Sequence, residues 1–239
     1  GEWTDIAFFQ AGPDGLRRDS EAGPGEPLSG WWFSITETDA NSDGLPDYVL
    51  GNVGHNIKFS ARPDKPFRVY ATDFDENGTN DIVLSKKYKG KYVPVRGREC
   101  SSQQMPFIAE KFPTYSEFAQ ASLEDVYGNT LESSYTREAQ SFTSILLLNQ
   151  GNGQFRIKDL PVEAQMIPLL DVVSMDVDGD GQQDLILAGN IYETEVETPR
   201  LDALSGSILL SNADGTYRSM SRKTSGLYIR GNAKSLQTV

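Results

Sequence analysis

Short runs of apolar residues separated by polar turns dominate the chain. Several of these runs, such as 31–33, 145–148 and 185–188, are apolar at consecutive positions. A sheet with one face in water would alternate apolar and polar residues, whereas strands covered on both faces need not. Glycine, asparagine and aspartate between such runs predict three hairpins. These lie at residues 6–18, 144–157 and 207–219. The pattern predicts an all-β fold whose sheets pack on one another.

One stretch departs from the strand pattern. Thr114 and Glu117 match a capping box, an apolar face follows, and Gly128 stands where a helix would end. We therefore expect a helix at about 115–127, within a helical insertion near 105–128 that occupies an excursion of about 97–143. Elsewhere the sequence suggests a short strand near 57–61 and a last strand at 235–239.

A nine-residue acidic loop at 176–184 carries the clearest chemistry. Its positions 1, 3, 5 and 9 are aspartates, Asp176, Asp178, Asp180 and Asp184, and position 6 is a glycine. Four carboxylates this close repel one another unless a cation neutralises them. Calcium takes six to eight oxygens at roughly 2.3–2.6 Å, and the carbonyl of Gln182 at position 7 can add another. The loop is therefore a candidate calcium site.

The same frame occurs twice more. Positions 1, 3, 5, 7 and 9 are Asp39, Asn41, Asp43, Leu45 and Asp47 in one copy, and Asp73, Asp75, Asn77, Thr79 and Asp81 in the other. An EF-hand would need a glutamate at position 12, but that position is leucine in all three loops, and the flanks favour strands. We expect up to three Ca²⁺ ions in strand–loop–strand sites. Because the first two loops lie close in sequence, the sheet between them is expected to be reduced or irregular.

These loops, followed by runs such as Leu185-Ile186-Leu187, resemble the FG-GAP/VCBS repeat family, which includes the integrin α-subunit propeller and bacterial surface proteins. Residues 145–155 resemble the second hairpin of that repeat, so the likeness covers 31–84 and 144–220. The resemblance implies a single calcium-binding β-propeller domain over 1–239, a partial ring or a small one of about four blades. It transfers no ligand-recognition residue. The spacing of hairpins and loops would put a fourth acidic loop after 235–239, so we expect a fragment of a longer protein, unless this last strand pairs with the N-terminal hairpin and closes the ring.

The net charge and the composition of the chain limit the kinds of partner that it can bind. A net charge of −12 argues against a nucleic-acid partner, which needs a basic face, and much of that charge sits in the three loops. The one basic stretch, 86–98, reads as an exposed hairpin or as a surface for an anionic glycan or an acidic partner segment. Cys100 is the only cysteine, and no apolar run is long enough to span a membrane.

Catalytic signatures are weak. His55 is the only histidine and has no nucleophile motif beside it, so we expect no enzyme activity. We expect instead a binding or adhesion module with structural calcium and a protein or carbohydrate ligand. Its place would be extracellular, at the cell surface or periplasmic. The alternatives are a polysaccharide-processing enzyme with calcium at its active site, and a lectin that uses Trp3, Trp31 or Trp32.

Overall fold

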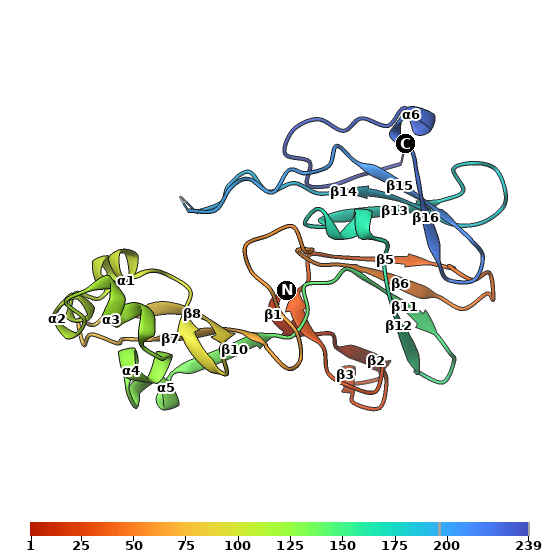
Figure 1. Ribbon diagram of the computed structural model, residues 1–239. Coiled ribbons are helices and arrows are strands. Elements are labelled where there is room, and N and C mark those ends of the chain that lie inside the picture. Colours follow the sequence, from red (N-terminus) through yellow and green to blue (C-terminus); the bar gives the residue numbers. More distant parts are fainter. Residues whose placement is uncertain (196, 239) are drawn as a thin grey trace. The chain divides into compact units, whose positions relative to one another are not determined.

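A computed structural model describes residues 1–195 and 197–238, which form several small antiparallel sheets and a few short helices (Figure 1). The chain divides into two compact units. Unit 1 contains residues 1–60 and the described residues from 142 onward, and unit 2 contains residues 61–141. The expected all-β character is therefore confirmed for the larger unit, whereas unit 2 adds a helical layer.

Unit 1 is built around two four-stranded sheets with one topology. The first contains β5 (Ser34–Thr38), β6 (Asp47–Gly51), β11 (Ile145–Asn149) and β12 (Phe155–Asp159). The second contains β13 (Asp171–Met175), β14 (Asp184–Ala188), β15 (Ser207–Ser211) and β16 (Tyr217–Met220). In each sheet every strand pairs antiparallel with the strand that follows it in this order. The hairpins expected at 144–157 and 207–219 are confirmed.

The first sheet is interrupted in sequence but complete in space. The chain leaves after β6 and returns at β11, which pairs with β6 through Leu146 opposite Val49. All of unit 2 lies in the intervening residues 52–144. The sheet is therefore irregular in sequence, as one of the two expected alternatives had it, but it is not reduced, because the residues that complete it come after the insertion.

The apolar run at 145–148 is buried on both faces, as its pattern predicted. Ser34 and Thr36 of β5 donate hydroxyl hydrogen bonds of 3.0 Å to the carbonyl oxygens of Leu169 and Val172, which joins the two sheets. Along β11, alternate leucines enter the main core between the sheets, while Ile145 and Leu147 pack in a second cluster with Trp32. Consecutive apolar residues thus fill two separate cores.

Two smaller sheets complete the strands of unit 1. The strand β1 (Glu2–Asp5) pairs with β4 (Ser29–Trp31). The hairpin expected at 6–18 is confirmed as β2 (Phe8–Gly12) with β3 (Gly15–Asp19). The ring of Phe8 stacks on that of Phe155 with centroids 4.9 Å apart, and this contact ties the hairpin to the first large sheet.

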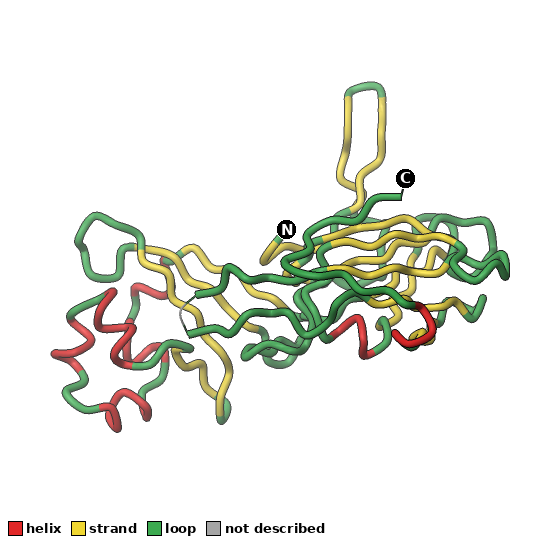
Figure 2. Tube along the Cα trace, turned by 90° about the horizontal axis from the view of Figure 1, so that it is seen from above, coloured by secondary structure: helices red, strands yellow, loops and turns green. Residues whose placement is uncertain are grey.

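Unit 2 has one sheet and a layer of helices. The sheet order is β10 (Tyr135–Ala139), β7 (Phe67–Thr72), β8 (Asp81–Tyr88) and β9 (Lys91–Pro94). Figure 2 shows the helices gathered beside these strands. They are α1 (Arg98–Gln104), α2 (Phe107–Lys111), α3 (Tyr115–Gln120), α4 (Leu123–Tyr127) and α5 (Thr130–Ser133). Tyr70 and Val83 of the sheet share a buried core with Ile108 and Leu123 of the helices.

The expected single helix at 115–127 is two helices. The capping box at Thr114 is present, with Glu117 N–H donating to the threonine hydroxyl at 3.2 Å. A second capping box begins at Ser122, whose hydroxyl accepts the N–H of Asp125 at 3.0 Å. Ser122 must be extended to cap α4, so the helix breaks there. The helical insertion near 105–128 lies within the run of helices from α1 to α5.

Two expected strands are absent from the described residues. Residues 57–61 form a bend and loop, and residues 235–238 are also non-regular, while Val239 lies outside the described chain. The backbone N–H of Leu236 donates to the carboxylate of Asp171 at 2.7 Å, so this segment is held by a side chain and not by a ladder. A 3₁₀ helix, η1 (Val162–Gln165), and a final turn of helix, α6 (Arg222–Ser225), complete the elements. Within residues 1–195 and 197–238, no helix has the length and apolar character to cross a membrane.

Candidate metal centre

All three acidic loops occupy the same topological position. Residues 39–47 join β5 to β6, residues 73–81 join β7 to β8, and residues 176–184 join β13 to β14. In each case position 9 is the first residue of the second strand. The strand–loop–strand frame expected from the sequence is therefore confirmed in both units.

The three loops also share an unusual backbone. Residues at positions 4 and 6 have positive φ, a backbone conformation that residues other than glycine rarely adopt. The position 4 angles are 56° at Ser42, 59° at Glu76 and 80° at Gly179, and those at position 6 are 81° at Gly44, 88° at Gly78 and 84° at Gly181. Two non-glycine residues thus accept a strained conformation in order to keep this loop shape.

Hydrogen bonds inside each loop fix that shape. The position 1 carboxylate accepts the N–H of the position 6 glycine, at 3.0 Å for Asp39, 2.7 Å for Asp73 and 3.0 Å for Asp176. A position 5 side-chain oxygen accepts the N–H of position 7 at 2.8 Å in every loop. The donors are the amides of Leu45, Thr79 and Gln182. In each loop, therefore, the backbone N–H groups of positions 6 and 7 donate to side-chain oxygens of positions 1 and 5.

Position 9 ties each loop to the body of its unit. Asp47 and Asp184 are buried, and each accepts the position 2 N–H of its own loop at 2.9 Å. Their second oxygens accept the N–H of Asn149 at 2.7 Å and of Ser211 at 2.8 Å, at the ends of β11 and β15. Asp81 is also buried and takes the amide of Gln104 from α1 at 3.1 Å. One carboxylate thus joins loop, second strand and a neighbouring element.

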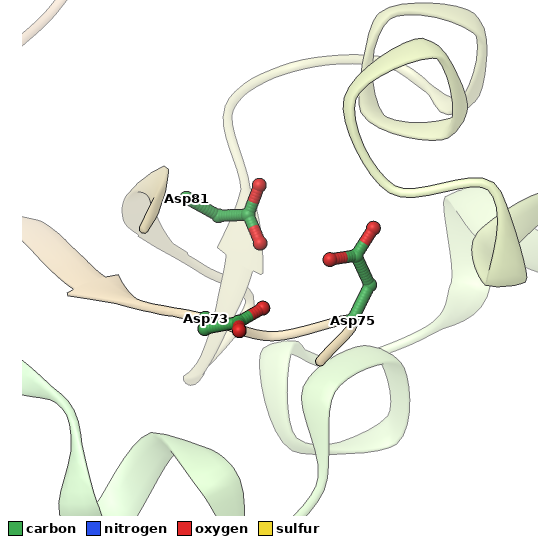
Figure 3. Close-up of side chains that lie close together, drawn as sticks. All are labelled: Asp73, Asp75 and Asp81. Atoms are coloured by element: carbon green, nitrogen blue, oxygen red, sulfur yellow. The ribbon is translucent and has the colours of Figure 1, made fainter. Parts of the chain in front are cut away.

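Two of the loops bring three carboxylates together. One oxygen from each of Asp73, Asp75 and Asp81 lies within 4.8 Å of the others, and Figure 3 shows the three side chains facing a shared space. The same holds for Asp176, Asp178 and Asp184. Carboxylate oxygens at this spacing are the ligands that calcium prefers. Positions 1, 3 and 9 can therefore hold a metal ion in these two loops.

The first loop differs at position 3. Asn41 replaces the aspartate there, and its amide donates to the carboxylate of Asp43 at 2.8 Å. Among the described residues, no carboxylate triad forms in this loop. Its backbone matches the other two, and Asn41 retains an amide oxygen that a cation can use. A third ion remains a prediction that rests on this shared frame.

The predicted ligands at positions 5 and 7 lie outside the carboxylate triads. Asp180 is exposed, and one of its carboxylate oxygens accepts the backbone N–H of Gln182. Asn77 makes the equivalent bond to Thr79. One oxygen of each position 5 side chain shapes the loop in this way, and ligation of an ion by positions 5 and 7 stays a prediction.

Burial controls the electrostatics of the first loop. The pKa of Asp47 is raised above its usual value, first because burial penalises the charged form. Hydrogen bonds from the backbone of Asn149 and Ala40 oppose this shift, while the nearby charges of Asp43 and Asp39 add to it. A bound cation would act in the opposite direction, because it stabilises the ionised carboxylate.

Sequence reasoning missed the partners that the loops use. The donors Asn149, Ser211 and Gln104 lie far along the chain and carry no motif of their own. It also missed a contact between two loops, in which the hydroxyl of Ser42 donates to the side-chain oxygen of Gln182. The hairpin turns at 149–154 and 211–216, which resemble each other in sequence, were the only available signal for two of these donors.

The other residues singled out in the sequence lie outside the acidic loops. The ring Nε2 of His55 lies 3.0 Å from the hydroxyl of Thr143, in a loop. Trp32 is buried, so it offers no sugar-stacking platform. Trp31 is half-buried and lies against the rings of Trp3 and Phe142, with centroids 5.1 and 5.0 Å away.

Comparison with known proteins adds no assignment. No family model, no curated protein and no solved structure matches this chain.

Proposed function

We propose that the chain is a calcium-stabilised binding module of a secreted, cell-surface or periplasmic protein. One observation carries this proposal: the same acidic loop recurs three times between the first two strands of a sheet, with a buried position 9 aspartate. A single acidic loop could be a solvated turn. Three loops share positive φ angles at positions 4 and 6 and the same internal hydrogen bonds. Binding of a hard cation by each loop would account for this shared geometry.

We also propose that the sheets are blades of a β-propeller of the FG-GAP/VCBS kind. In support, both large sheets of unit 1 are four-stranded meanders with the acidic loop after the first strand. They pack face to face and leave strands covered on both sides, as propeller blades do.

Calcium in this proposal is structural. The carboxylates that face the candidate ion also accept backbone N–H groups from the loop and from neighbouring strands. An ion held there stabilises the link between loop and sheet. The activity of the module would then be recognition of a protein or carbohydrate ligand by another surface.

Calcium selectivity tests this proposal. Isothermal titration of metal-free protein is expected to show Ca²⁺ binding with Kd of about 10⁻⁴–10⁻³ M, the range of extracellular modules. Magnesium should bind more weakly, because it demands a small octahedral site and gives up water reluctantly. No heat with calcium, or stronger binding of magnesium, would contradict the proposal.

A further inference from the structure

The sheet of unit 2 has one covered and one open face. Side chains alternate across a strand, and directly opposed residues on neighbouring strands share a face. Tyr70 and Val83 are paired and pack against the helices. The opposite face carries Ala71 beside Ile82, and Val69 beside Leu84. We call this second side the open face, although its end at Phe67 and Ala139 is buried.

Large apolar side chains on the open face are exposed. Ile82 is 57% exposed, and Tyr135 and Tyr88 are 59% and 55% exposed. Tyr135 lies on the same row as Ile82, because both pair with Ala71. Isolated exposed residues are common, but a continuous row across three strands of one sheet indicates a surface made for contact.

The charge on the open face is of one sign. Lys86 and Arg137 are exposed and lie on this face. Lys91 also belongs to it by register, but its ammonium donates to the carbonyl oxygen of Gln120 in the helix layer. Among its described residues in the four strands, the open face carries no carboxylate. Glu138 points to the other side, where it pairs with Arg68 at 3.0 Å.

This charge is unusual for the chain as a whole. The net charge is −12, yet unit 2 contains 11 of the 22 lysines and arginines and 12 of the 34 acids. Cations are therefore concentrated in the unit that carries the open face. A basic, apolar surface on an acidic protein selects partners of opposite charge and repels copies of the same face.

We propose that the open face binds an acidic protein partner through a segment in which apolar side chains lie among carboxylates. The proposal rests on the proposed function and names the ligand class of that module. The centre of the open face is aliphatic, with Ile82, Leu84 and Val69, and the margins of this face carry tyrosine and cationic side chains. An apolar centre with aromatic and arginine residues is the composition of a protein interface.

A carbohydrate fits this face less well. Sugars stack on open aromatic rings, but the guanidinium carbon of Arg137 lies 4.7 Å from the ring centroid of Tyr135. The ammonium of Lys89 lies 5.3 Å from that of Tyr88. The tyrosines are also at opposite margins, separated by aliphatic residues that offer a sugar no hydrogen bond.

The test uses a defined probe. A fluorescein-labelled octapeptide of alternating glutamate and valine is titrated with the full chain in calcium, and binding is followed by fluorescence polarisation. Its control replaces each glutamate by lysine. The acidic peptide is expected to bind at least about tenfold more tightly, and more weakly as salt increases.

Matched variants locate the site. Lys86→Glu, Arg137→Glu and Ile82→Ser should each weaken binding by about fivefold or more, because each removes a contact on the open face. Lys87→Glu makes the same charge change on the same strand, but Lys87 pairs with Tyr92 on the helix-covered side. It should change binding less than about twofold. Ile35→Ser, at a 68% exposed strand position of unit 1, is the apolar control.

Three outcomes would overturn the proposal. One is equal binding of the acidic and lysine peptides, and a second is an equal loss with Lys86→Glu and Lys87→Glu. The third is binding of polygalacturonate with no binding of the acidic peptide, which would make the open face a glycan site. Melting temperatures in calcium and in EGTA are measured on the same samples, so a failure of the calcium module is seen separately from a failure of this ligand class.

Discussion

Removal of calcium with EGTA is expected to lower the melting temperature of the protein by roughly 10 °C. Without an ion, the three carboxylates of each triad lie within 4.8 Å and repel one another. Calcium at tenfold its Kd stabilises the native state by about 1.4 kcal/mol per site, so two or three sites contribute roughly 3–4 kcal/mol. This is a large part of the ~5–15 kcal/mol that holds a domain folded.

The measurement is thermal unfolding followed by circular dichroism, in calcium, in EGTA, and in EGTA with excess magnesium. Calcium added back after chelation should restore the original melting temperature, which separates ion loss from irreversible damage. An unchanged melting temperature, in protein shown to contain bound calcium before chelation, would contradict structural calcium.

Asp184→Ala is expected to destabilise the protein by about 3 kcal/mol even in the absence of calcium. The carboxylate is buried and accepts N–H groups from Val177 and Ser211, at 2.9 and 2.8 Å. Alanine would leave both donors without this partner, at about 1–3 kcal/mol each. The same argument applies to Asp47, which accepts N–H groups from Ala40 and Asn149.

The control for this variant lies in the same loop. Asp178 is an exposed member of the same triad, so Asp178→Ala should weaken calcium binding while leaving calcium-free stability nearly unchanged. Urea unfolding of both variants in EGTA measures the difference. Equal calcium-free stabilities of Asp184→Ala and Asp178→Ala would show that position 9 has no anchoring role.

The local features of this fold were predictable from sequence. The acidic loops, the hairpins and the capping box at Thr114 each depend on residues within about a dozen positions, so spacing alone identifies them. The two-sided burial of 145–148 was also predictable, because consecutive apolar residues in a strand must face two cores. The second capping box at Ser122 could have been read from Asp125 and would have predicted the helix break.

The non-local features were not predictable. Nothing in the residues near Gly51 or Ile145 indicates that β6 pairs with β11 across all of unit 2. The assignment of Gln104 as a partner of Asp81 depends on the same long-range packing. The open face could not be predicted from the sequence for a related reason. Ile82 and Tyr135 lie in one row only because β8 and β10 both pair with β7.

The central claim is that the acidic loops hold calcium, and the most direct test is the number of ions bound per chain. Equilibrium dialysis against about 10 mM calcium, at least tenfold above the expected Kd, fills the sites. Metal content measured by atomic emission then gives that number for the parent and for variants of position 3. We predict one calcium ion in each carboxylate triad and a third in the loop at 39–47. Asp75→Ala and Asp178→Ala should each reduce the number of bound ions by one. Fewer than two ions in the parent, or a number unchanged by both substitutions, would contradict it.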